Sequence, residues 1–117
     1  MNCILISPKI ILSKHKTINH VVEDNWFKYL SKKKVKLLPV NVKSFQKKDL
    51  AELKPKAVIL SGGNDLPIII NNKANTIREK NDNFLFKYAQ SKRIPILAVC
   101  HGFHFVAKKL GAKIIKI

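Results

Sequence analysis

The chain has 117 residues and a formal net charge of +16, a length that fits one domain with a real hydrophobic core. Its basic residues are mostly lysine, with Arg78 and Arg93 as the two arginines, and they are scattered through every segment of the sequence. Because arginine is the usual residue for bidentate phosphate and base recognition, this composition argues against specific nucleic-acid binding. It leaves nonspecific attraction to polyanions at low salt.

The cysteine content predicts a reducing, cytoplasmic setting. Cys3 and Cys100 are the two cysteines, and no Cys-x-x-Cys pair offers a metal or redox site. The apolar run 3–12 is interrupted by Pro8 and Lys9 and is too short to cross a membrane. We therefore expect a first strand here, with no signal peptide and no membrane association.

Continuous apolar runs predict four or five β-strands that alternate with helices. The runs are 3–7, 35–40, 57–61, 94–100 and 112–117. Parallel strands that are covered on both faces have this unbroken apolar character. The order of elements predicts an α/β fold with a doubly wound, mostly parallel sheet and right-handed crossovers.

Helical spacing of apolar residues and capping signals predict the helices. A first helix is expected over 18–33, and a short one between the second and third strands. Thr76 and Glu79 have the form of a capping box, which predicts the start of a long helix. A last helix follows Cys100 and ends near Gly111, and the longest irregular stretch is 65–74.

The corner between the 94–100 strand and the last helix resembles a nucleophile elbow, with Cys100 at the bend. The small residues Ala98 and Gly102 stand two places to either side, as a tight strand-to-helix turn requires. The N-terminus of the following helix should favour the thiolate, and the N–H of His101 is placed to be an oxyanion donor. The alternative for Cys100 is a buried, inert cysteine.

A second strand ends in Gly62 and Gly63, whose backbone N–H groups can face a ligand at close range. The alternative is an ordinary turn. Because parallel strands place their carboxyl ends at one edge of the sheet, we expect this loop and Cys100 to converge there.

Three segments give the chain its resemblance to a known family: 24–30 with 37–41, 58–66, and 94–102. In this order they resemble the N-terminal half of a class I glutamine amidotransferase domain. Within that group the chain is most similar to the gamma-glutamyl-gamma-aminobutyrate hydrolase-like branch, the C26 cysteine peptidase family. The resemblance implies a flavodoxin-like fold in which residues 1–117 form a partial domain, truncated after the elbow helix.

The resemblance implies a cysteine-dependent amide hydrolysis. Cys100 would attack the amide carbonyl of glutamine or a gamma-glutamyl compound, forming a thioester and releasing ammonia or an amine. The N–H groups of Gly63 and His101 would form the oxyanion hole. Gly62, Gly63 and His104 would contact the substrate, with His104 standing where the family usually has glutamine. The family uses no cofactor and no metal for this step.

The chain departs from the family in its acid–base residues. No His-x-Glu pair follows the elbow, so a second polypeptide or domain would complete the triad or accept the ammonia. His104 is a weaker candidate base, and His15 and His20 are expected at the surface. Where the family has Arg-Asp-x-x-Glu, the chain has its two acids exchanged in type, in the segment Arg78-Glu79-Lys80-Asn81-Asp82. We expect Arg78 to be structural or to order a loop.

Two other functions stay open. The chain could be a non-catalytic α/β remnant or interaction module, in which an exposed sheet edge around 112–117 promotes self-association. It could also be a deglycase-like cysteine hydrolase that uses Cys100 and His101. Pro8 and Lys9 stand where those enzymes have a glutamate, which favours the amidotransferase interpretation.

Overall fold

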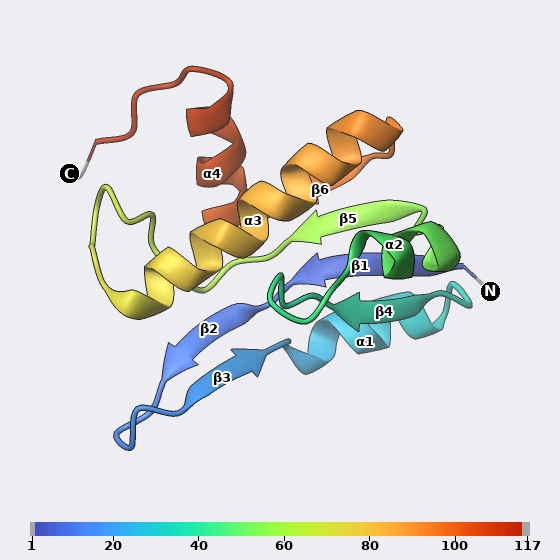
Figure 1. Cartoon of the computed structure of the whole chain (residues 1–117), viewed down its shortest axis with the longest axis horizontal. Coiled ribbons are helices and arrows are strands. Elements are labelled where there is room, and N and C mark those ends of the chain that lie inside the picture. Colours follow the sequence, from blue (N-terminus) through green and yellow to red (C-terminus); the bar gives the residue numbers. More distant parts are fainter. Residues whose placement is uncertain (1, 116–117) are drawn as a thin grey trace.

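The fold is built on a four-stranded parallel sheet (Figure 1). The computed structural model describes residues 2–115, without the side chain of Lys47. The strands, in spatial order, are β4 (Lys36–Pro39), β1 (Cys3–Ser7), β5 (Ala57–Leu60) and β6 (Ile96–Ala98). The prediction of an α/β fold with a mostly parallel sheet is confirmed, and three of the strands lie within one residue of their predicted limits at either end.

Helices cover both faces of the sheet because successive strand residues point to opposite sides. On one face, Leu5, Val58 and Leu60 pack against α2 (Lys47–Leu53), α3 (Lys73–Lys92) and α4 (His101–Lys109). On the other face, Ile6 and Ile59 pack against Leu30 of α1 (Asp24–Ser31). These strand side chains are at most 3% exposed, as their continuous apolar sequence predicts.

The prediction of a first helix over 18–33 is wrong for residues 18–23. β2 (Lys9–Leu12) and β3 (Ile18–Val21) form an antiparallel hairpin that projects from the sheet (Figure 1). The hairpin turn is closed by Ser13, whose N–H donates to the Thr17 carbonyl and whose hydroxyl accepts from the Thr17 N–H. These local bonds and the pairing with β2 outweigh the helical spacing, so α1 begins at Asp24.

The long helix starts three residues before the predicted capping box. The side chain of Asn72 caps α3 by accepting from the Asn75 N–H at 2.8 Å. Thr76 then lies in the first turn, where its hydroxyl donates to the Asn72 carbonyl at 2.9 Å. Asparagine satisfies the first free N–H groups as well as serine or threonine does.

The predicted final strand is absent in the part of it that the structure describes. Residues 112–115 are irregular, with Ile115 exposed, and 116–117 lie outside the described residues. The sheet edges are β4 and β6 instead, so the expected edge around 112–117 is wrong for 112–115. None of the described helices has the length and apolar character needed to cross a membrane.

Gly102 fixes where α4 meets the sheet. An ideal Cβ built on Gly102 would lie 2.0 Å from the carbonyl oxygen of Leu60 and 2.7 Å from its Cβ. These atoms belong to a central strand and cannot swing aside, so only glycine allows α4 to begin against the end of β5.

We expect Gly102→Ala to lower the free energy of unfolding by about 3 kcal/mol or more, because the backbone must separate to admit a methyl group. Gly111→Ala is the matched control. Gly111 has φ +99° and open space around it, so alanine there should cost only about 1–2 kcal/mol of backbone strain. Urea unfolding of both variants checks this, and equal losses would contradict the close contact.

Candidate active site at the carboxyl edge of the sheet

Cys100 lies at a strained bend between β6 and α4. Its backbone has φ 51° and ψ −109°, a conformation that L-residues rarely adopt, and its side chain is exposed. The bend is held by the Val99 N–H, which donates to the Leu60 carbonyl, and by the His104 N–H, which donates to the Cys100 carbonyl. Strained backbone at an exposed nucleophilic side chain is typical of a nucleophile elbow.

The glycine loop after β5 lies directly beside this cysteine. An ideal Cβ on Gly62 would lie 3.2 Å from Cys100 Cβ and 3.9 Å from Cys100 Sγ. Gly63 has φ +114°, which favours glycine, and the aliphatic part of Lys9 covers it. The structure therefore brings the Gly62–Gly63 loop and Cys100 together at the carboxyl edge of the sheet.

Two backbone donors at this edge are unused. The N–H groups of Gly63 and His101 donate to no backbone acceptor within residues 2–115. Gly63 follows Gly62, which lies beside Cys100, and His101 is the residue directly after Cys100.

An open cavity of about 460 Å³ borders the cysteine. Its lining combines the elbow, the glycine loop and the α1 segment with its N-cap, which contributes Glu23, Asn25, Trp26 and Tyr29. The α1 segment thus supplies a carboxylate, an amide and two aromatic rings. Sequence reasoning did not assign these four residues to the site, although 24–30 was one of the segments that carried the family resemblance.

Beneath the edge, the buried carboxylate of Asp82 joins three elements. Its Oδ1 accepts from Ser7 Oγ of β1 at 2.5 Å and from Arg78 Nε of α3 at 3.0 Å. Its Oδ2 lies 2.8 Å from Nε2 of His101, the first residue of α4. Asp82, Arg78 and Ser7 are fully buried and His101 is 3% exposed.

Arg78 carries this network to the glycine loop. Its guanidinium donates to the carbonyl of Ser61 and, through Nη1 at 3.3 Å, to the carbonyl of Gly62. All described peptide bonds are trans, so a carbonyl and the next N–H point in opposite directions. Because the Gly62 carbonyl points inward to Arg78, the Gly63 N–H points outward. The expectation that Arg78 orders a loop is confirmed.

Asparagines hold the far end of the same loop. Asn64 exchanges two hydrogen bonds of 2.9 Å with the backbone of Ile10, which ties the loop to the hairpin. Asn75 accepts from the Asp65 N–H at 3.3 Å and from Asn64 at 3.2 Å. The sequence contains one signal for this network of polar side chains. Asn75, Arg78 and Asp82 have helical spacing, which places all three on the face of α3 that packs toward the sheet.

The histidines divide into one buried ring and three exposed ones. Because carboxylate oxygens accept, the His101 Nε2 carries the proton it shares with Asp82, and its Nδ1 has no partner within residues 2–115. His104 is exposed on α4 with its ring centroid 6.1 Å from that of Phe103, and the structure does not bring it to the cavity. His15 and His20 are exposed, as predicted.

Comparison with protein-family models identifies the family. The model for glutamine amidotransferase class-I matches residues 18–117. The chain belongs to the class I glutamine amidotransferase family. This membership confirms the family predicted from the three segments, and both the elbow and the glycine loop lie within the matched range. Searches of curated proteins and of solved structures gave no match.

The two cysteines of this amidotransferase-family chain should differ sharply in reactivity. Burial raises the pKa of the Cys3 thiol, so less of its thiolate forms near neutral pH, whereas Cys100 is exposed at the elbow. We expect iodoacetamide at pH 8 to modify Cys100 alone in the folded protein and both cysteines after unfolding in urea.

Mass spectrometry of tryptic peptides measures both sites, and Cys100→Ala and Cys3→Ala are the matched controls. Cys3→Ala should keep the fast reaction and Cys100→Ala should lose it. Equal modification of Cys3 and Cys100 in the folded chain would contradict the placement of Cys100.

Proposed function

We propose that this chain supplies the nucleophile and the oxyanion hole for amide hydrolysis of glutamine or a gamma-glutamyl compound. The observation that carries the proposal is the exposed Cys100 sulfur beside the Gly62–Gly63 loop, with the Gly63 N–H turned outward. Membership of the class I family supports glutamine amidotransferase-type chemistry in general.

The proposed reaction begins with attack of the Cys100 sulfur on the amide carbonyl carbon. A C–S bond forms, and the negative charge on the tetrahedral oxygen is stabilised by the N–H groups of Gly63 and His101. Collapse breaks the C–N bond, and the nitrogen leaves as ammonia or an amine after it takes up a proton. Water then attacks the thioester, which releases the γ-carboxylate and restores the thiol.

The shape of the site suits a small amino-acid-like substrate. The cavity of about 460 Å³ lies next to Cys100 and is bordered by Glu23, the N-cap of α1, and by Asn25 of α1. A carboxylate and an amide in the lining of one cavity can hold an ammonium and a carboxylate of the substrate. We therefore propose Gly62 and Gly63 as backbone contacts, with His104 kept as the residue at the family's glutamine position. The gamma-glutamyl-gamma-aminobutyrate hydrolase-like branch is the finer assignment we favour.

The general base is proposed to come from outside the described residues. No histidine lines the cavity next to Cys100 in the part of the chain that the structure describes, and the His101 ring is directed to Asp82. A second domain or polypeptide would bring an imidazole to the open side of the cavity. Under this proposal, the described part of the chain recognises the substrate, whereas complete turnover also needs the imidazole from outside it.

A diazoketone analogue of glutamine tests recognition without requiring turnover. We expect it to alkylate Cys100 at least about tenfold faster than a diazoketone without the amino-acid group, because the cavity holds the analogue near the sulfur. Glutamine should protect, and Cys100→Ala should not react. Mass spectrometry against time gives the rates.

Two results would contradict the proposal. Equal rates for the two diazoketones with no protection by glutamine would favour a non-catalytic remnant. Protection by a carbonyl adduct such as a glyoxal hemithioacetal, but not by glutamine, would favour the deglycase-like hydrolase.

A further inference from the structure

The turns that lead from a helix into a strand gather at the amino edge of the sheet, opposite the candidate site (Figure 1). The amino edge comprises residues 32–35 with Lys36, the first residue of β4, residues 54–56 before β5, and residues 93–95 before β6 with Lys92, the last residue of α3. Backbone hydrogen bonds join them to the strand starts: Lys36 N–H donates to the Asn2 carbonyl, Lys56 N–H to the Cys3 carbonyl, and Val58 N–H to the Pro95 carbonyl.

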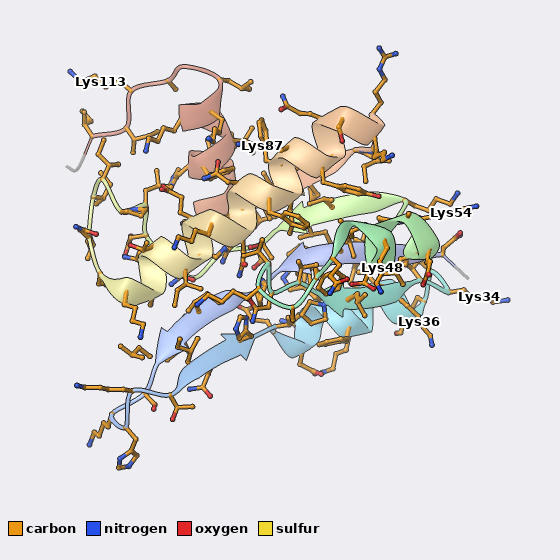
Figure 2. The ribbon with its side chains drawn as sticks, in the orientation of Figure 1. Lys34, Lys36, Lys48, Lys54, Lys87 and Lys113 are labelled. Atoms are coloured by element: carbon orange, nitrogen blue, oxygen red, sulfur yellow. The ribbon has the colours of Figure 1, made fainter. Side chains whose placement is uncertain are left out.

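These twelve residues form a dense positive surface, which we call the amino-edge basic surface. Eight of them are basic, none is acidic, and all eight basic side chains are exposed. Lys34, Lys36 and Lys54 are seen at the same end of the molecule in Figure 2. The eight residues are Lys32, Lys33, Lys34, Lys36, Lys54, Lys56, Lys92 and Arg93, and none forms an ion pair with another described residue.

The opposite edge carries a smaller net charge. Its strand-to-helix connections, 8–23, 40–46, 61–72 and 99–100, contain four lysines and two acidic residues, a net charge of +2 against +8 at the amino edge. These residues are Lys9, Lys14, Lys16, Lys43, Glu23 and Asp65. The basic residues look scattered in the sequence, but the parallel topology collects eight of them at one edge. The net charge of +16 is therefore unevenly distributed between the two edges.

We propose that the amino-edge basic surface binds the phosphate backbone of nucleic acid without sequence preference. The edge of four strands spans about 14 Å at the usual strand spacing, which corresponds to about four phosphates along one strand. Lysine ammonium groups are compact point charges that attract phosphates but lack the guanidinium fork that reads bases. Binding of this kind is compatible with the prediction from the composition that the chain does not recognise nucleic acid specifically.

The composition of the surface favours nucleic acid over a lipid bilayer. Membrane-surface binding normally adds apolar or aromatic side chains that enter the headgroup region. The exposed large apolar residues of the described chain all lie outside 32–36, 54–56 and 92–95. Binding at this edge would leave the cavity beside Cys100 open, so the proposal does not depend on the proposed function.

Two variants with the same net charge test whether nucleic acid binds at the amino-edge basic surface. The edge variant carries Lys33→Gln, Lys34→Gln, Lys36→Gln, Lys54→Gln and Lys56→Gln. The control variant carries Lys14→Gln, Lys16→Gln, Lys73→Gln, Lys80→Gln and Lys113→Gln, which replace exposed lysines elsewhere. Circular dichroism and iodoacetamide modification of Cys100 show that both variants keep the fold and the elbow.

Fluorescence anisotropy at 50–200 mM salt measures the affinity of each protein for a mixed-sequence 20-base-pair duplex and for its scrambled version. We expect equal binding of both duplexes and a log–log salt slope of about −4 for the unmodified chain. The edge variant should bind about tenfold or more weakly with a shallower slope, and the control variant within about threefold of the unmodified chain. Equal losses in the two variants, or binding to phosphatidylserine vesicles without binding to the duplexes, would overturn the proposal.

Discussion

The buried carboxylate of Asp82 is the interaction on which the candidate site depends. It accepts from Ser7 at the end of β1 and from Arg78 one helical turn away, and it fixes the ring of His101 at the start of α4. Removing one partner of such a buried pair typically costs about 3–5 kcal/mol, because the other charge stays unpaired away from water. Arg78 and Asp82 balance each other's charge, so the interior tolerates both.

The hydrogen bonds around Asp82 link the packing of α3 to the orientation of two backbone N–H groups. Arg78 draws the carbonyls of Ser61 and Gly62 inward, and the planar trans peptide then turns the Gly63 N–H away from Arg78, outward from the interior. His101 anchors the first turn of α4 through its side chain, while its own N–H donates to no backbone acceptor among residues 2–115. One acidic residue on α3 therefore controls both proposed oxyanion donors, although it contacts neither.

The sequence predicted the parts of the fold that depend on continuous apolar runs and on local turn chemistry. The β1 and β5 strands, the elbow at Cys100 and the Gly62–Gly63 loop are of this kind, because burial on both faces and a tight bend each leave a clear local pattern. The hairpin was missed because β3 is defined by its pairing with β2 and not by its own periodicity. The contact between Ser7 and Asp82 joins residues 75 apart, which no local pattern reveals. The gathering of lysines at one edge likewise depends on the parallel topology.

The central claim is that Asp82 orients the glycine loop and the elbow together. The most direct measurement is the backbone amide NMR spectrum of Asp82→Asn compared with that of the unmodified chain. If Asp82 orients both segments, the amide signals of Gly62, Gly63 and His101 will shift together. The amide signal of Val40, whose N–H donates to the Ile6 carbonyl in the β1–β4 region, will keep its position in the spectrum. Gly62 and Gly63 signals that stay in place while His101 alone moves would contradict this claim.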